Sequence, residues 1–184
     1  MSRIVCYIAM TLDGYIADEQ GGVGFLDSIN DCGDDFGYQR FFDSVDSVVM
    51  GAKTYEQILS FGEYPYSTKK SFVFTNRKEE LLARTTFQDD LENPIQFLSG
   101  DIKERIEELR GKNSYETLWL VGGGHLIKQM IEEKLLDELI LFIVPMLLGT
   151  GVPMFEQIKT DGLFSLLSVK EYSKGTLELR YNLK

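Results

Sequence analysis

The sequence predicts a single α/β domain over residues 1–184, built on a mixed and mostly parallel β-sheet with helices on both faces. Three observations lead to this prediction. Short apolar runs typical of strands alternate along the chain with amphipathic segments of helical period. The run at residues 4–10 is continuously apolar, as expected of a central strand covered on both faces. The chain also ends in two strand-like segments joined by a tight turn, which predicts a C-terminal antiparallel hairpin.

Composition limits the partners and the compartment. The 184 residues are 43% hydrophobic and 26% charged, which suits one globular domain with a sizeable core. The formal net charge of −10 argues against a nucleic-acid partner. Cys6, Cys32 and His125 are the only cysteines and the only histidine, so no metal site is predicted and a reducing, cytoplasmic location is expected. No apolar run reaches membrane length.

After the first strand, Asp13 and Gly14 predict a turn and residues 19–24 a polar loop. A short helix is expected around Phe36 and Phe41, with Asp34 and Asp35 at its front. These two aspartates have two interpretations. They cap the helix, or one of their carboxylates faces a pocket.

Residues 47–50 predict a second strand, which a helix containing Tyr55 and Ile58 follows. Thr54 and Gln57 have the spacing of a capping box, which by itself accounts for Thr54. Further strands are predicted at residues 71–75 and 95–98, and an amphipathic helix at residues 101–110.

Residues 117–133 predict a buried strand, a turn of three glycines and an amphipathic helix. Glycines allow a sharp turn and the close approach of another group, and the start of a helix attracts anions. Gly122, Gly123 and Gly124 therefore indicate either a phosphate-binding turn or a plain tight turn. The run lacks the last glycine of G-x-G-x-x-G and the Gly-Lys-Ser/Thr of a P-loop.

The remaining chain predicts a strand at residues 137–144, a turn-rich loop at 149–153 and a hairpin of strands at 164–172 and 176–183. In the last strand, leucine and tyrosine alternate with Glu178, Arg180 and Asn182, which predicts a half-exposed antiparallel strand.

Three turns, at residues 51–54, 75–77 and 122–125, all follow predicted strands and carry glycine, hydroxyl or cationic groups. Ligands of open α/β sheets bind at the carboxyl ends of strands. Because all three turns fall at the carboxyl ends of strands, together they predict a nucleotide cofactor more strongly than any single turn does.

Five segments of the chain form a recognisable set: IAMTLDGYIA at residues 8–17, VMGAKTYE at 49–56, FTNR at 74–77, LVGGG at 120–124 and PMLLGTGVPMF at 145–155. Together they resemble the dihydrofolate reductase superfamily, and most closely the C-terminal reductase domain of the bifunctional riboflavin-biosynthesis deaminase/reductase. The segments run along nearly the whole chain in family order. The resemblance implies a three-layer dihydrofolate reductase-like fold and NADPH as the cofactor.

By this resemblance, the cofactor would lie across the strand ends. Ala9 and Ile16 would hold the nicotinamide, and Thr75, Asn76 and Arg77 would surround the adenosine 2′-phosphate. Leu126 would pack near the adenine side, although core packing explains it equally well. The residues expected in the two pyrophosphate turns are Gly51, Lys53, Thr54, Val121, Gly122, Gly123, Gly124 and His125.

Two departures from the family pattern matter. Ala52 replaces an arginine that the family often has, which removes one 2′-phosphate charge and leaves the preference between NADPH and NADH open, with Arg77 or Lys53 as compensating cations. The loop tryptophan of dihydrofolate reductases is missing, while Asp35, or its neighbour Asp34, lies near the position of their catalytic acid.

We therefore expect an NADPH-dependent reductase that transfers a hydride to a small pteridine-like or ribosylaminopyrimidine-like heterocycle, or to a carbonyl or imine compound. The alternative is a non-catalytic nucleotide-binding module that retains the fold. The resemblance and the apolar C-terminal strands also favour a homodimer.

Overall fold

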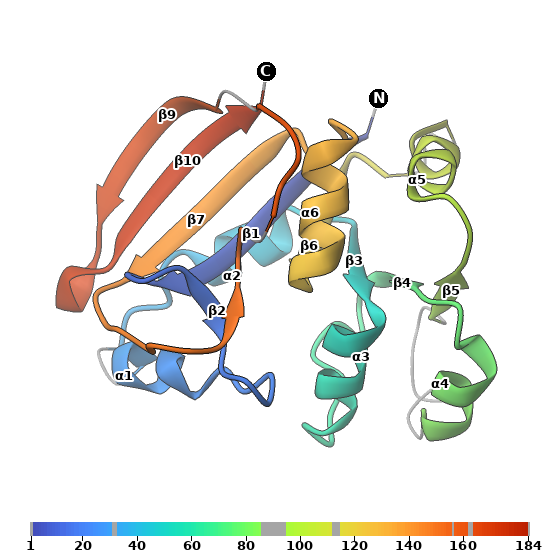
Figure 1. The fold of residues 1–184 in the computed structure, drawn as a ribbon, viewed down its shortest axis with the longest axis horizontal. Coiled ribbons are helices and arrows are strands. Elements are labelled where there is room, and N and C mark those ends of the chain that lie inside the picture. The colour runs from blue at the N-terminus through green and yellow to red at the C-terminus, as the bar shows by residue number, and fades with distance from the viewer. Residues whose placement is uncertain are drawn as a thin grey trace.

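The computed structural model describes residues 2–30, 33–85, 95–111, 115–155, 157–161 and 164–183. These residues form an eight-stranded sheet in the order β5-β4-β3-β6-β1-β7-β10-β9 (Figure 1). Its strands are β1 (Arg3–Thr11), β3 (Ser47–Gly51), β4 (Lys70–Phe74), β5 (Gln96–Leu98), β6 (Thr117–Gly122), β7 (Glu138–Val144), β9 (Phe164–Glu171) and β10 (Leu177–Leu183). Every strand predicted from the sequence is present.

The six strands from β5 to β7 are mutually parallel, and β10 and β9 continue the sheet in antiparallel fashion. The C-terminal hairpin turns through a short 3₁₀ segment, η3 (Ser173–Gly175). The predicted mixed, mostly parallel sheet with a C-terminal antiparallel hairpin is therefore confirmed.

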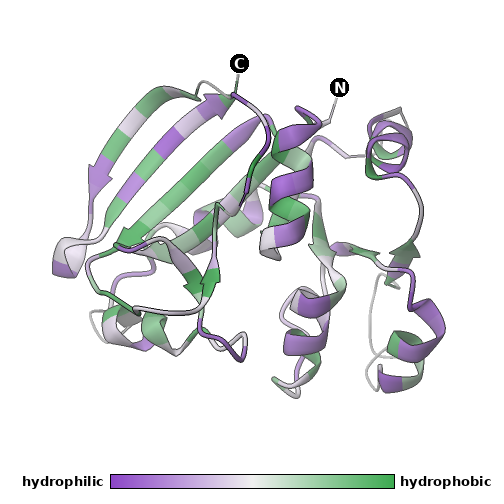
Figure 2. Cartoon of the chain, in the orientation of Figure 1, coloured by the Kyte–Doolittle hydropathy of each residue, from purple (hydrophilic) through white to green (hydrophobic). Residues whose placement is uncertain are grey.

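Helices cover both faces of the sheet. Residues on α2 (Tyr38–Asp43), α3 (Ala52–Leu59) and α4 (Lys78–Arg84) pack on one face, and residues on α5 (Ile102–Gly111) and α6 (Gly124–Glu132) pack on the other. In β1, Val5 faces the first core and Cys6 the second, and both are fully buried. Figure 2 shows the same arrangement as hydrophobic colouring along the central strands and polar outer faces on α5 and α6. The three-layer prediction is confirmed.

Helix α4 was not predicted, because its sequence KEELLAR has little apolar periodicity. Its fully buried residue is Leu81, while Leu82 is half-exposed. Between residue 17 and α2 the chain also forms η1 (Gly24–Leu26) and α1 (Asp27–Asn30), which the sequence did not predict either. Cys32 lies outside the described residues, whereas Cys6 is buried as expected.

A two-stranded ribbon of β2 (Tyr15–Ala17) and β8 (Val152–Pro153) lies beside the main sheet. Asp13 holds its two connections together, because its carboxylate accepts hydrogen bonds from the Thr11 hydroxyl at 2.5 Å, the Gly149 N–H at 2.7 Å and the Leu148 N–H. The predicted turn at Asp13 and Gly14 is present, with Gly14 at φ +88°.

The alternation predicted for β10 is wrong at one position. Glu178 was expected on the exposed side, yet it is 5% exposed. Its carboxylate accepts hydrogen bonds from the Tyr172 hydroxyl at 3.0 Å and from Arg180 Nε at 2.5 Å. These partners make burial of the charge tolerable. Among the described residues, no helix is long and apolar enough to span a bilayer.

Candidate functional site

The three predicted turns lie on three neighbouring strands. They follow β4, β3 and β6, which are adjacent in the sheet and parallel, so their carboxyl ends meet at one edge. The chain then enters α4, α3 and α6. Open α/β sheets bind their ligands at this kind of edge.

The starts of α3 and α6 lie next to each other. Met50 pairs with Gly122 in the sheet, and a Cβ on Gly51 would lie 4.0 Å from the Gly122 carbonyl oxygen. The N–H of Gly123 donates to Thr54 Oγ1 at 2.9 Å, which links the first turn of α3 to the triglycine turn. The capping-box interpretation of Thr54 is wrong, because α3 begins at Ala52 with Gly51 as its N-cap.

The triglycine turn has a demanding backbone. Gly122 has φ +148°, which disfavours any residue with a side chain. A Cβ on Gly124 would lie 3.1 Å from the Pro153 carbonyl oxygen, so β8 approaches the start of α6 closely. Tight packing within the chain thus accounts for part of this glycine run.

The same turn presents hydrogen-bond donors. The N–H groups of Leu126 and Ile127 donate to the Gly123 carbonyl. Helix geometry leaves Gly124 and His125 without an intrahelical acceptor. Together with the start of α3, this places two positive helix ends side by side, and the Lys53 and His125 side chains are exposed near them. These residues fit a pyrophosphate.

The β4 turn is more heavily charged. Thr75 Oγ1 accepts the Arg77 N–H at 2.9 Å, while Asn76 and Arg77 are exposed. The Arg77 guanidinium is paired with Glu56 of α3 at 3.1 Å and with Glu80 of α4 at 3.0 Å. Arg77 is therefore at the predicted position, but it is paired with acids there.

The residues expected at the nicotinamide end lie on central elements. Ala9 is on β1 opposite Phe142, and both Ala9 and Val121 pack against the first core. Ile16 of β2 comes within 3.8 Å of the Cβ position of Gly124. Leu126 is 4% exposed and packs in the second core, as the core interpretation of this residue requires.

Asp34 and Asp35 precede α2, which begins later than expected, at Tyr38. Asp35 accepts the N–H groups of Gly37 at 2.8 Å and Gln39 at 3.2 Å, and these bonds hold the pKa of its exposed carboxyl below the usual range. Asp34 accepts the Phe36 N–H at 2.9 Å. Asp35 therefore caps the start of α2 through the Gln39 N–H and is ionised at neutral pH, whereas Asp34 bonds the turn just before the helix.

Sequence reasoning missed a group of residues beside Asp35. The Tyr7 ring stacks on Phe41 at 4.2 Å, and burial, together with its neighbours Tyr172, Glu178 and Asp35, raises its pKa. Lys170 Nζ lies 3.9 Å from the centre of the Tyr172 ring. These side chains come from β1, α2, β10 and the end of β9, and no local motif links them. The sequence gives no signal for the group, because alternation places Glu178 on the exposed side of β10.

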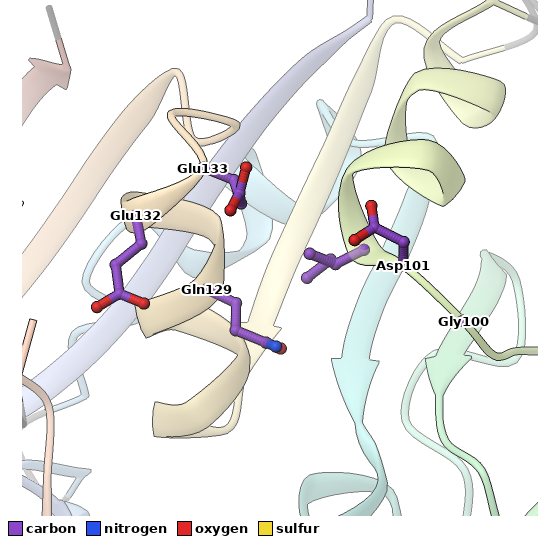
Figure 3. Close-up of a pocket in the computed structure, with 6 residues that line it drawn as sticks. Gly100, Asp101, Gln129, Glu132 and Glu133 are labelled. Carbon is purple, nitrogen blue, oxygen red and sulfur yellow. The ribbon is translucent and has the colours of Figure 1, made fainter. Parts of the chain in front are cut away.

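A hollow of about 410 Å³ lies elsewhere, between the start of α5 and the C-terminal half of α6 (Figure 3). Asp101, Glu132 and Glu133 line it, with Gly100, Ile102 and Gln129. None of these residues is basic, so the hollow does not suit a phosphate. Among the described residues, no cluster of histidine, cysteine and carboxylate side chains has the arrangement of a metal site.

The sheet order, the C-terminal antiparallel strands and the paired helix starts define an α/β domain of the dihydrofolate reductase-like class. The chain belongs to the family of the RibD C-terminal domain, whose model matches residues 2–177. The resemblance to this reductase-domain family is thereby confirmed, and so is the dihydrofolate reductase-like fold.

Other proteins resemble the chain along nearly its full length. The uncharacterized protein YwjB of Bacillus subtilis (strain 168) is 31% identical over 180 residues, which are 97% of each chain. A crystal structure of a putative riboflavin biosynthesis protein from Shewanella sp. PV-4 is 31% identical, with a TM-score of 0.86 over 100% of this chain and 99% of that one. Dihydrofolate reductase from Enterococcus faecalis, complexed with NADP(H) and RAB-propyl, has a TM-score of 0.64 at 14% identity, over 99% and 96% of the two chains, which shows the fold alone.

Proposed function

We propose that the protein is a reductase that takes a hydride from NADPH and transfers it to a small heterocycle of the pteridine or ribosylaminopyrimidine type, or to a carbonyl or imine compound. The observation that carries this proposal is the meeting of the α3 and α6 N-termini at Gly51 and Gly122. Membership of the RibD C-terminal domain family supports the same chemistry.

The nicotinamide supplies the hydride when it is bound. The chain's own residues bind the cofactor and orient its nicotinamide. Lys53, Thr54 and the N–H groups of Gly124 and His125 hold the pyrophosphate. Ala9 and Ile16 form the apolar contact for the nicotinamide. The ribbon of β2 and β8, which Asp13 ties to the β7 end of the sheet, excludes water from that side.

On the substrate side, Asp35 is proposed to anchor a polar ring. Because its carboxylate is ionised at neutral pH, it accepts a hydrogen bond from a ring N–H or amino group. Asp34, which also lies within 3.5 Å of the Ser173 hydroxyl, is the neighbouring acid. The aromatic rings of Tyr7 and Tyr38 offer a stacking surface beside them.

Direct titration tests the proposal. Trp119 is the only tryptophan, and its indole N–H donates to the Tyr7 carbonyl at 3.1 Å, so its fluorescence reports on this region. We expect NADPH to bind the purified protein, both by fluorescence and by calorimetry. Lys53→Gln should weaken binding by about fivefold, the effect of roughly 1 kcal/mol from one exposed charge-assisted contact.

Lys159→Gln is the matched control, because Lys159 is exposed and lies near the far end of α6, where its N–H contacts Glu132. Equal losses in both variants, or no binding of either NADPH or NADH by the unchanged protein, would remove the cofactor assignment. If binding holds, oxidation of NADPH is then measured with pteridines, ribosylaminopyrimidines and small carbonyl compounds.

A second candidate is a nucleotide-binding module without catalysis. The observation in its favour is that Asp34, Asp35 and Glu178 all have hydrogen-bonding partners within the protein. Tight NADPH binding without oxidation by any of these substrates would favour it. Oxidation that depends on one substrate would exclude it.

A further inference from the structure

Glu56 joins two helices at the carboxyl edge of the sheet. Both of its carboxylate oxygens accept from Arg77, Oε1 from Nη1 at 3.2 Å and Oε2 from Nη2 at 3.1 Å. Oε1 also accepts from Arg84 at 2.9 Å. One carboxylate on α3 thus holds the guanidinium groups from the N-cap and the last turn of α4.

Arg77 is consequently committed on two sides. Besides the fork-shaped pair with Glu56, its Nη1 donates to Glu80 at 3.0 Å. Two arginines and two glutamates form the cluster, so its formal charge is zero. The side chain of Glu56 is 23% exposed, against 46% for Arg77, so the carboxylate is the more enclosed partner. Hydrogen bonds from Arg77 lower the pKa of Glu56, which keeps it ionised at neutral pH.

This arrangement bears on the adenosine end of the proposed dinucleotide. A 2′-phosphate is accommodated by an available arginine, whereas a free ribose 2′-hydroxyl is recognised by an acid. Here Ala52 provides no cation at the first position of α3, and Arg77 already pairs with Glu56 and Glu80. A bound 2′-phosphate, which carries up to two negative charges, would have to displace these carboxylates or lie against them.

Resting on the proposed function, we infer that Glu56 is a specificity-determining residue that suppresses discrimination in favour of NADPH, so that NADH and NADPH bind with affinities within about tenfold of each other. The carboxylate does this by neutralising Arg77. Removing its charge should release Arg77 for the 2′-phosphate.

The experiment uses two pairs of ligands that differ at this one group. We would measure dissociation constants of the wild-type protein and of Glu56→Gln for NADPH and NADH, and for 2′,5′-ADP and 5′-AMP, by calorimetry. In the variant, the affinity ratio in favour of the 2′-phosphorylated ligand should rise by about fivefold or more. One unit charge at about 4 Å contributes that factor in water-like surroundings.

Two further variants separate specificity from folding. Glu79→Gln removes a charge from the adjacent position of α4, and Glu79 forms no ion pair within the described residues, so the ratio should stay at the wild-type value. In the double variant Glu56→Gln/Arg77→Gln, the gain should disappear, because the released cation is gone. Circular dichroism would check that each variant is folded.

The outcomes distinguish this inference from the proposed function. The inference is wrong if the wild-type protein binds NADPH far more than tenfold more tightly than NADH, or if Glu56→Gln leaves the ratio of the two affinities unchanged. Either result would leave the proposed dinucleotide site standing. An equal shift in Glu79→Gln would also overturn the inference. If no dinucleotide binds to any variant, both the inference and the proposed function fail.

Discussion

Gly151 shows how much one missing side chain can matter. It has φ +153°, and a Cβ built on it would lie 2.2 Å from the carbonyl oxygen of Ala17. Since that neighbour is backbone, no side-chain rotation relieves the overlap. Gly151 therefore determines how closely β8 approaches β2. Because Pro153 of β8 also contacts Gly124, it affects the packing at the start of α6 as well.

We expect Gly151→Ala to destabilise the fold by about 2–4 kcal/mol, because it adds backbone strain and overpacking. The melting temperature should fall by roughly 5–15 °C for a chain of this length. Gly111→Ala is the control. Gly111 ends α5 with nothing within 4 Å of its Cβ position, so its substitution should be neutral or slightly stabilising. Similar losses in both variants would contradict the packing argument.

Residue types predicted the position of Arg77 but not its environment. Glu56 and Arg77 are 21 positions apart and come from different helices, so no i,i+4 pattern relates them. The burial of Glu178 was missed for a similar reason, because alternation places a glutamate outward unless its tertiary partners are known. The sequence could not decide whether Asp34 and Asp35 cap a helix or face a pocket, because capping and ligand binding need the same residue type.

At the scale of elements, strands could be predicted better than helices. The strands are near-continuous apolar runs, and the three turns proposed to bind the cofactor follow from where those runs end. Helix α4 and the ribbon of β2 and β8 were not predicted, because each buries few residues and depends on contacts with distant segments. The neighbouring order of β4, β3 and β6 also comes from tertiary pairing and not from any one strand.

The connection between β1 and β2 gives a pH-dependent prediction. The Thr11 hydroxyl, followed by the N–H groups of Gly149 and Leu148, lowers the pKa of Asp13 in the folded protein. A lowered pKa contributes stability that is present above the unfolded pKa of about 4 and is lost as the pH falls through the folded value.

Asp13→Asn should therefore melt at a lower temperature than the wild-type protein at pH 7. The difference should shrink as the pH falls from about 4 through the lowered pKa of folded Asp13, below which both side chains are neutral. Thermal melts across this pH range test the prediction. The control is Asp43→Asn, because Asp43 accepts a hydrogen bond from the side chain of Gln39. Asp18→Asn is not a suitable control, because Asp18, like Asp13, accepts hydrogen bonds from backbone N–H groups. A difference that persists unchanged at low pH would exclude the carboxylate as its cause.

At the scale of the whole molecule, the antiparallel edge of the sheet has no further strand beside it in the part of the chain that the structure describes. β9 is the last strand, and its Leu166, Leu167 and Val169 are 55%, 53% and 55% exposed. Leu166 and Val169 pair with Tyr181 and Leu179, which face the second core, so the apolar surface continues across β10. Exposed apolar edge strands invite pairing with another chain.

We propose that this edge pairs with a second copy of the chain. The test is the molecular mass of the protein in solution. Sedimentation should give a dimer for the wild-type protein and a monomer for Val169→Lys, because a buried, unpaired ammonium opposes association. Leu147→Lys changes an equally apolar residue that is 69% exposed in the loop after β7, so it should leave the dimer intact. A wild-type monomer, or dissociation of both variants, would exclude the β9 interface without bearing on the fold or on the proposed cofactor site.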